Sequence, residues 1–258
     1  MRTVVVTGAA RGIGAATARC LSEKGWAVVL VDVPDGDTGG YPTADSGDLE
    51  AVAASCVAPH LVVEADVRSP QALAEAVAAG VGRFGSLDAA VATAGVVVGG
   101  VPVWELSDRQ WEVNIDTNLT GVFNLARAAI PHLLASHKPR SGRFVAVASA
   151  AGHRGLPLLG AYVAAKHGVL GLVRSLALDL RGTGVTANAI APGSTDTVAL
   201  SESARIYDME SPDEFGVRVP IERLIQPAEI ASSVAWLLSE DAAAVTGACI
   251  DIDGGMTA

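Results

Sequence analysis

The chain is poor in aromatic and in charged residues. Phe, Trp and Tyr make up 4% of its 258 residues, and Asp, Glu, Lys and Arg together make up 18%. Half of the residues are nevertheless apolar, so a sizeable core is expected, built mainly from Ala, Val and Leu. This composition excludes disorder as the dominant state. Because no linker or shift in composition divides the chain, we expect a single domain over residues 1–258.

Cysteines and basic residues are also few. Cys20, Cys56 and Cys249 are odd in number and have no paired spacing, which argues against a disulfide framework and favours a reducing, cytoplasmic setting. They do not lie in the spacing typical of a structural metal site, so no metal is expected. With 18 Lys and Arg against 28 Asp and Glu, the net charge is −10. An acidic chain repels phosphate backbones, so nucleic acid is not an expected partner.

Long apolar runs are missing as well. No uncharged run is long enough to span a bilayer, and the opening MRTVVVTG reaches a glycine turn too early for a signal peptide. We therefore expect no membrane partner.

Short apolar runs alternate with longer Ala- and Leu-rich stretches along the whole chain. Continuous apolar runs are typical of strands buried on both faces of a parallel sheet. The strands are expected at 3–7, 27–32, 61–66, 88–93, 143–149, 185–191 and 248–252. The helices are expected at 12–24, 48–57, 70–84, 108–136, 158–181 and 227–239. This alternation predicts an α/β fold of the Rossmann type, with a doubly wound parallel sheet of about seven strands flanked by helices.

Two segments interrupt the alternation. Residues 34–48 form a Gly- and Asp-rich loop after the second strand, and residues 197–225 are irregular and polar. Ligands of such sheets bind outside the carboxyl ends of the strands. We therefore expect residues 34–48 to cover a cofactor and residues 197–225 to cover a substrate. Tyr41 could stack on the adenine or ribose of a nucleotide, or belong to a surface turn with Pro42.

The sequence TGAARGIG at 7–14 follows the first strand and begins a helix. Glycines permit a sharp turn and the close approach of a pyrophosphate, and the helix N-terminus offers free N–H groups. Asp32 ends the next strand, where its carboxylate suits a ribose diol and repels a 2′-phosphate. The alternative for Asp32 is a strand-end cap. Arg11 would favour NADP, but Asp32 is the stronger indication and favours NAD.

Tyr162 and Lys166 are four residues apart on an expected helix and share one face of it. A neighbouring ammonium lowers the pKa of a phenol toward the range of a general base. Ser149, at the end of the fifth strand, offers a hydroxyl that can hold a substrate oxygen. An isolated pair of this kind is usually part of a solvated helix face, so the pair alone does not identify a site.

Together with other motifs, these residues resemble the short-chain dehydrogenase/reductase family over essentially the whole chain. The further matches are ADV at 65–67, NLTG at 118–121, SAAG at 149–152, YVAAK at 162–166, PGSTDT at 192–197 and DGG at 253–255. The resemblance implies that Tyr162 is the general acid/base and that Lys166 lowers its pKa and holds the nicotinamide ribose. It also implies that Ser149 positions the substrate oxygen and that Asn118 anchors a water of the proton relay. The resemblance implies NAD as the cofactor and a homotetramer as the assembly.

The cofactor is expected to contact residues from both halves of the chain. They are Gly8, Arg11, Gly12, Ile13, Gly14, Asp32, Asp66, Val67, Thr93, Ala94, Gly95, Tyr162, Lys166, Pro192, Gly193, Thr195 and Thr197. For Asp66, which could hold the adenine amino group, a role as a turn residue is an equal alternative.

The chain departs from the family pattern after the fourth strand, where the usual Asn-Asn-Ala-Gly reads Ala92-Thr93-Ala94-Gly95. Both amides are lost, and Thr93 is expected to replace part of their hydrogen bonding. The insertion at 34–48 resembles that of the mycofactocin-associated subgroup, as do the segments 142–155 and 180–195. In that subgroup the insertion is thought to cover an NAD that does not readily exchange, and the electrons would pass to mycofactocin, a peptide-derived partner.

The expected substrate is a hydrophobic secondary alcohol or its ketone, because most candidate lining residues are apolar. They are Val97, Trp104, Ala151, Leu156 and Tyr207, of which Trp104 could equally be a core residue. Three alternatives stay open: a family member with freely exchanging NAD(H), a non-catalytic nucleotide-binding protein, and an isomerase or dehydratase that uses NAD without net redox.

Overall fold

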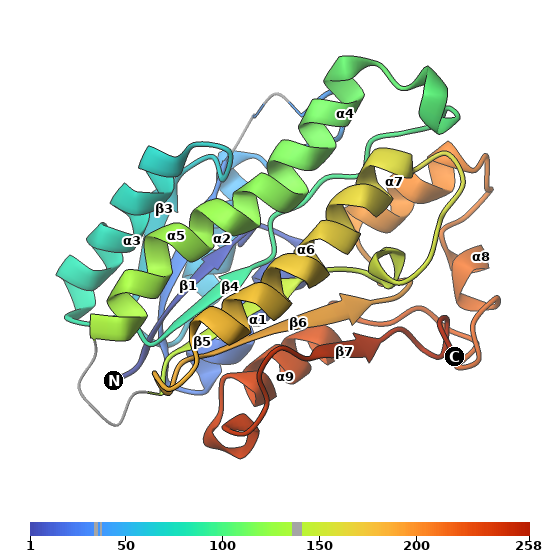
Figure 1. Ribbon diagram of the computed structural model, residues 1–258. Coiled ribbons are helices and arrows are strands. Elements are labelled where there is room, and N and C mark those ends of the chain that lie inside the picture. The colour runs from blue at the N-terminus through green and yellow to red at the C-terminus, as the bar shows by residue number, and fades with distance from the viewer. Residues whose placement is uncertain (34–35, 37, 136–140) are drawn as a thin grey trace.

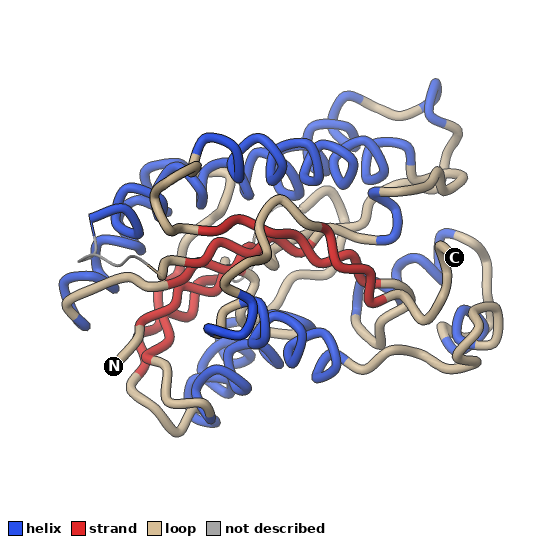
Figure 2. The backbone as a smooth tube through the Cα atoms, turned by 60° about the horizontal axis from the view of Figure 1, so that its bottom comes forward, coloured by secondary structure: helices blue, strands red, loops and turns tan. Residues whose placement is uncertain are grey.

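A computed structural model shows a parallel β-sheet between two layers of helices (Figures 1 and 2). It describes residues 1–33, 36, 38–135 and 141–258. Within them, seven strands form one sheet in the order β3-β2-β1-β4-β5-β6-β7, with all neighbours parallel. The predicted fold class is therefore confirmed. The strands are β1 Thr3–Thr7, β2 Ala27–Asp32, β3 His60–Glu64, β4 Ala89–Ala92, β5 Arg143–Val147, β6 Thr186–Pro192 and β7 Cys249–Ile252.

The helices lie on both faces of this sheet. The longer ones are α1 Gly12–Glu23, α2 Ser46–Ser55, α3 Pro70–Phe84, α4 Asp108–Ile115, α5 Gly121–Ala135, α6 Gly160–Asp179, α7 Val198–Ile206 and α9 Pro227–Leu237. A single turn, α8, spans Asp213–Gly216, and short 3₁₀ segments lie at Val103–Glu105, Ala150–Gly152 and Glu240–Ala242. No helix in the described ranges is long and apolar enough to cross a membrane.

The two faces of the sheet carry separate apolar clusters, which explains why the strands read as unbroken apolar runs. One cluster packs α3, α5 and α6 on the sheet, through side chains such as Leu73, Leu125 and Val173. The other packs α1, α2 and α9, through Leu21 and Ile230 among others. Full burial of each such side chain contributes about 1.5–3 kcal/mol. The low aromatic content is consistent with this close packing of small aliphatic side chains.

The long helix expected at 108–136 is interrupted. A π-helical segment, Asp116–Thr120, separates α4 from α5. Within it, the buried side chain of Asn118 donates a hydrogen bond to the Val96 carbonyl and accepts one from the Val96 N–H, both at 3.0 Å. The tertiary contact with Val96 lies outside any local helical pattern, so periodicity alone did not indicate the interruption. Segments of this kind are frequent at functional sites.

The segment 197–225 is more ordered than its composition suggested. It contains α7 and α8, and α7 places Val198, Ala199 and Ile206 against an apolar cluster around Val96–Val98. This tertiary packing stabilises a stretch that was expected to be irregular. Similarly, α2 begins at Ser46 rather than at 48, because Asp45 and Asp48 form a reciprocal capping box there.

The order of strands reverses at β1, which has β2 on one side and β4 on the other. The carboxyl ends of the strands on both sides of this switch point meet at one edge of the sheet. A parallel sheet of this type binds its ligands there. The motifs that follow β1, β2, β4, β5 and β6 in the sequence are thus brought to one region.

Candidate active site

Two adjoining pockets lie at this edge of the sheet. Ile13, Thr93, Gly95 and Thr197 line both of them. The expected cofactor residues that line the first pocket are Gly8, Arg11, Gly12, Ile13, Gly14, Asp32, Asp66, Val67, Thr93, Ala94, Gly95 and Thr197. The second pocket is lined by the remaining ones, Tyr162, Lys166, Pro192, Gly193 and Thr195.

The turn between β1 and α1 leaves no room for side chains at two positions. A Cβ on Gly8, whose φ is +68°, would lie 2.7 Å from the Cα of Ala94, and one on Gly14 would lie 1.9 Å from the Gly8 carbonyl oxygen. The N-cap residue of α1, Arg11, makes no side-chain capping hydrogen bond. The first N–H groups of α1 are thus not capped by that side chain, and together with the glycine turn they suit a phosphate group.

Asp32 ends β2 beside this turn. Its two carboxylate oxygens accept hydrogen bonds from the N–H groups of Ala10 and Val33, each at 2.8 Å. Burial raises the pKa of Asp32, and the two backbone N–H groups and the nearby Arg11 partly offset that rise. Each oxygen retains a second lone pair, so the carboxylate can accept hydrogen bonds from a diol in the first pocket. The residues of the turn and Asp32 therefore fit an adenine dinucleotide without a 2′-phosphate.

Asp66 follows β3 and also lines the first pocket. Its carboxylate accepts hydrogen bonds from the backbone and side chain of Arg68, with the shortest at 2.6 Å. Burial opposes ionisation, but these hydrogen bonds and the charge of Arg68 together lower the pKa of Asp66. The geometry therefore shows the turn role of Asp66, which also lines the pocket, and its contact with an adenine amino group stays a prediction.

Thr93 forms two hydrogen bonds with Thr7 at the end of β1. Its hydroxyl donates to the backbone carbonyl of Thr7, and its N–H donates to the Thr7 hydroxyl at 3.3 Å. These contacts join the end of β1 to the loop after β4. The loop therefore stays close to the glycine turn although Ala92 and Thr93 stand where two Asn residues are usual.

Part of the segment 34–48 lines the first pocket. Residues 34, 35 and 37 lie outside the described ranges, but Thr38, Tyr41, Thr43 and Ala44 face this pocket. The Arg11 guanidinium donates to the Pro42 carbonyl and lies 5.6 Å from the centre of the Tyr41 ring. Tyr41 is buried against Val96–Val98 and is therefore not part of a solvated surface turn.

Ser149, Tyr162, Lys166 and Asn118 come together in the second pocket. Ser149 follows β5 and caps a 3₁₀ turn by accepting from the Ala151 N–H at 3.1 Å. The Ser149 side chain interacts with the Tyr162 hydroxyl and acts to lower the pKa of that phenol. The Nζ of Lys166 lies 5.6 Å from the centre of the Tyr162 ring. One hydroxyl pair and one ammonium thus line a single wall of the pocket.

The pKa values at this wall are governed mainly by burial. Burial raises the pKa of the Tyr162 phenol, and the interaction with Ser149 offsets only part of the rise. Burial also lowers the pKa of Lys166 to about 8. The expected lowering of the tyrosine pKa is therefore not seen in this arrangement, because desolvation of the phenolate outweighs the interaction with Ser149.

Asn118 lies next to this wall but uses its side chain to hold the backbone of Val96. Gly95 fits beside it only because it lacks a side chain, since a Cβ there would lie 2.7 Å from the Asn118 Oδ1. The contacts show a positioning role for Asn118. Its part in a proton relay stays a prediction.

Four of the five expected substrate residues line the second pocket: Val97, Ala151, Leu156 and Tyr207. Trp104 does not, and that prediction is wrong: the short 3₁₀ turn Val103–Glu105 directs the indole outward, where it is 81% exposed. Lys166 is the sole Lys or Arg among the described residues that line this pocket. Arg154 donates to the Met256 carbonyl and Arg205 pairs with Glu202, and neither of them lines this pocket.

Several pocket residues were not expected from the sequence. Leu200 and Ser203 come from α7, and Met256 comes from the C-terminal residues. Leu200 and Ser203 are three residues apart in VALSESARI, a spacing that indicates a shared helical face. Met256 carries no sequence signal, because its position depends on the turn that Asp253 stabilises by accepting hydrogen bonds from Gly255 and Thr257.

Comparison with known proteins agrees with this geometry. Residues 8–257 match the family described as enoyl-(acyl carrier protein) reductase. The chain is 36% identical to (−)-trans-carveol dehydrogenase of Rhodococcus erythropolis, over 99% of this chain and 97% of that protein. It is 38% identical to cis-4-hydroxycyclohexanecarboxylate dehydrogenase of Sinomonas cyclohexanicum, over 100% and 97%.

Solved structures show the same likeness. The crystal structure of carveol dehydrogenase from Mycobacterium avium in complex with NAD superimposes with a TM-score of 0.91 at 31% identity, over 98% of this chain and 96% of that one. Levodione reductase superimposes with a TM-score of 0.89 at 34% identity, over the same shares. Sequence motifs, fold and relatives agree, and the chain therefore belongs to the short-chain dehydrogenase/reductase family of oxidoreductases.

Proposed function

We propose that this protein is an NAD-dependent dehydrogenase that interconverts a hydrophobic cyclic secondary alcohol and its ketone. The observation that carries the proposal is the wall formed by Ser149, Tyr162 and Lys166 in an otherwise largely apolar pocket that opens onto a dinucleotide groove. The presence of all three side chains argues against a non-catalytic nucleotide-binding protein.

The reacting groups have distinct roles. The Ser149 hydroxyl donates a hydrogen bond to the substrate oxygen, and the phenolate of Tyr162 takes the alcohol proton. The glycine turn and Asp32 would hold NAD, which would supply the hydride acceptor for the carbinol carbon, so that the alcohol becomes a ketone. Lys166 is fixed beside Tyr162 by a 3.0 Å hydrogen bond to the Val147 carbonyl, and its charged form stabilises the phenolate.

NAD is the cofactor that the groove favours over NADP. Asp32 places a carboxylate where a 2′-phosphate would lie, and like charges there would repel. Arg11 does not offset this, because its guanidinium is bound to the Pro42 carbonyl and faces the Tyr41 ring. The carveol dehydrogenase that superimposes on this chain was solved with NAD.

The substrate class follows from the lining of the second pocket. Leu156, Val97 and Phe215 provide apolar walls, and no basic side chain other than Lys166 lines it in the described part of the chain. Relatives that act on carveol and on a hydroxycyclohexanecarboxylate favour a six-membered ring that bears a secondary hydroxyl. We favour the uncharged ring, because neither Arg154 nor Arg205 reaches into the pocket to pair with a carboxylate.

A finer proposal concerns how the cofactor is held. The contacts of Arg11 with Pro42 and Tyr41 join the segment 34–48 to the glycine turn across the first pocket. We propose that this cover retains NAD and that mycofactocin, a peptide-derived electron carrier, reoxidises it. The alternative is an ordinary family member in which NAD(H) exchanges freely.

The first experiment separates these alternatives. The purified protein, with no cofactor added, is denatured, and the supernatant is assayed for NAD(H). Turnover of carveol-like and unsubstituted cyclohexanols is then measured with free NAD and, separately, with an artificial electron acceptor. Retained NAD with turnover only in the presence of the acceptor supports the held cofactor, whereas an empty protein that turns over with free NAD contradicts it.

The same assays test the reaction itself. A preference for small hydroxy acids over cyclic alcohols would refute the substrate class. If no alcohol yields a ketone under either condition, the proposal of a dehydrogenase fails, and an isomerase or dehydratase becomes the better interpretation.

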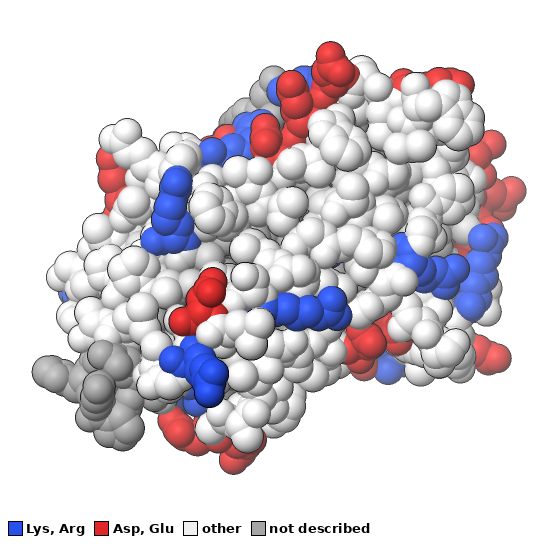
Figure 3. Space-filling model, viewed as in Figure 1, with Lys and Arg blue, Asp and Glu red and all other residues white. Residues whose placement is uncertain are grey.

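We also propose a homotetramer in the cytoplasm. Figure 3 shows few charged side chains over α5 and α6, and Phe123 and Leu178 on these helices are exposed. An apolar surface of this kind suits contact between copies of the chain. The three cysteines are unpaired, as expected in a reducing compartment. Light scattering coupled to size exclusion tests the assembly, and a monomer would contradict it.

A further inference from the structure

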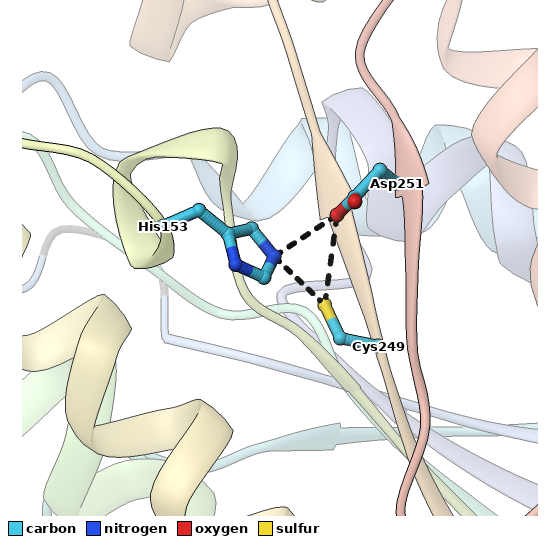
Figure 4. Close-up of side chains that lie close together, drawn as sticks. All are labelled: His153, Cys249 and Asp251. Carbon is cyan, nitrogen blue, oxygen red and sulfur yellow. Dashed lines mark hydrogen bonds and ion pairs between the residues drawn. The ribbon is translucent and has the colours of Figure 1, made fainter. Parts of the chain in front are cut away.

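Three metal-ligating side chains converge at one edge of the sheet, outside both pockets (Figure 4). Cys249 and Asp251 belong to β7, the last strand of the sheet, and His153 follows the 3₁₀ turn Ala150–Gly152. The Nε2 of His153 lies 3.0 Å from the Asp251 Oδ1 and 3.4 Å from the Cys249 Sγ. The Sγ and Oδ1 atoms are 3.8 Å apart.

The backbone places these side chains together. Cys249 and Asp251 are two residues apart on a strand, so their side chains project from the same face of the sheet. His153 lies on the loop that connects β5 to α6, and α6 packs on that same face of the sheet. Strands β5 and β7 both pair with β6, so the two segments are neighbours although 96 residues separate His153 from Cys249.

The imidazole and the thiol can each donate to the Asp251 carboxylate, which leaves the contact between the ring nitrogen and the sulfur without a hydrogen bond of its own. One ring nitrogen faces a carboxylate oxygen and a sulfur at once, and a single N–H can point well at only one of them. A cation at the centre would interact with all three donor atoms. In a tetrahedral zinc site, neighbouring donor atoms are about 3.4–3.6 Å apart, given Zn–S near 2.3 Å and Zn–N and Zn–O near 2.0–2.2 Å. Each observed distance lies within about 0.4 Å of these values.

We propose that His153, Cys249 and Asp251 form a binding site for one divalent transition-metal ion of the zinc type. Imidazole and thiolate ligands favour zinc over magnesium or calcium, which prefer sites made of oxygen ligands. Thiolate and carboxylate together neutralise a divalent ion. His153 and Asp251 are partly exposed to solvent, so the ion can enter and water can complete the tetrahedron.

Such an ion would connect β7 to the loop behind the proposed active-site wall. His153 is four residues beyond Ser149, and Ala151, between them, lines the second pocket. The ion would therefore stabilise the folded chain by linkage, since the unfolded chain does not hold the three ligands together.

Cobalt and zinc titrations test the proposal without measuring enzyme activity. Protein without an affinity tag is treated with a chelator and titrated with Co²⁺. We expect one equivalent to bind, with the absorption bands of tetrahedral cobalt and a thiolate-to-cobalt charge-transfer band. Zn²⁺ should displace the cobalt and raise the unfolding temperature of the protein.

Substitutions assign the ligands. His153→Ala, Cys249→Ser and Asp251→Asn should each weaken binding by at least about tenfold, since even outer-shell changes cost 10–100-fold. Cys249→His keeps a ligand, so it should retain binding but lose the charge-transfer band. Cys56→Ser and His167→Ala serve as matched controls that should bind like the wild type. Unfolding curves in chelator establish that each variant folds.

The possible outcomes are distinct. Failure of folded wild-type protein to bind cobalt or zinc saturably would overturn the proposal. The proposal would also be overturned if each of the three ligand variants bound metal like the wild type, or if the Cys56 and His167 controls lost binding to the same extent.

Discussion

The Nζ atom of Lys166 donates a 3.0 Å hydrogen bond to the carbonyl oxygen of Val147, two residues before Ser149. This bond joins helix α6, which carries Lys166, to the end of strand β5 at Val147, beside the proposed catalytic residues. The lysine is almost fully buried, and burial lowers its pKa to about 8. The same contact that positions the ammonium therefore keeps it in surroundings that disfavour its charge.

Stability should depend on pH through Lys166. The unfolded lysine holds its proton up to its ordinary pKa near 10.4, whereas the folded one releases it near pH 8. Between these values the unfolded state binds more protons, so the free energy of unfolding rises with pH. Without added NAD, the wild type should gain on the order of 3 kcal/mol relative to Lys166→Met between pH 7 and 10.5. Denaturant titrations at both pH values measure this gain, and parallel curves for the two proteins would contradict it.

Removal of the Tyr162 hydroxyl should abolish most turnover. Tyr162→Phe deletes the proposed general base, so kcat should fall by roughly 10²–10⁴-fold while the NAD content of the protein stays unchanged. Because burial raises the pKa of Tyr162, alcohol oxidation by the wild type should become faster as the pH increases and the phenolate is populated. Tyr207→Phe is a matched control: Tyr207 lines the same pocket, but its hydroxyl donates to the Pro157 carbonyl, so we expect a much smaller loss. A near-wild-type rate in Tyr162→Phe would refute the assignment.

Thr93→Val should loosen the cofactor groove. The substitution keeps the shape of the side chain but removes the hydroxyl that donates to the Thr7 carbonyl, which costs about 1–3 kcal/mol of stability if that carbonyl stays unpaired. Thr183→Val removes a bond to the Leu180 carbonyl and the acceptor of the Val185 N–H, at a place away from both pockets. Both variants should unfold at lower denaturant concentration, but only Thr93→Val should release NAD more readily. Equal NAD affinity in the two variants would show that Thr93 has no specific role in the groove.

The glycine turn should tolerate no side chain at Gly14. In Gly14→Ala the new methyl group would lie 1.9 Å from the Gly8 carbonyl oxygen, so the turn must open, and NAD content should fall sharply. Gly82→Ala, near the end of α3, meets nothing within 4 Å. That control should be more stable by about 0.5–1 kcal/mol, as alanine is favoured over glycine in helices. NAD retention by Gly14→Ala would contradict the role of the turn.

The local features of the fold could be read from the sequence. Unbroken Val-rich runs predicted the buried strands, and Ser69 with Pro70 predicted the start of α3, where Ser69 caps the helix by accepting from the Ala72 N–H. These signals are visible because strand burial and helix capping depend on neighbouring residues. The candidate site was visible through its motifs, since strand-end residues of a parallel sheet necessarily meet at one edge.

Contacts between distant segments were decided by the tertiary structure alone. The exposure of Trp104 depends on the direction of a 3₁₀ turn, and the helix at α7 depends on packing against Val96–Val98. The pKa of Tyr162 depends on burial by residues from several elements, so the Tyr-Lys spacing in the sequence could not show whether that pKa is raised or lowered. His153 and Cys249 meet only because β5 and β7 both pair with β6.

The sequence therefore determined the fold, the family and the residues of the proposed catalytic wall, because these follow from local pattern and strand order. The tertiary structure decided which side chains are desolvated and which distant ones meet, because desolvation and convergence arise only when the elements pack together.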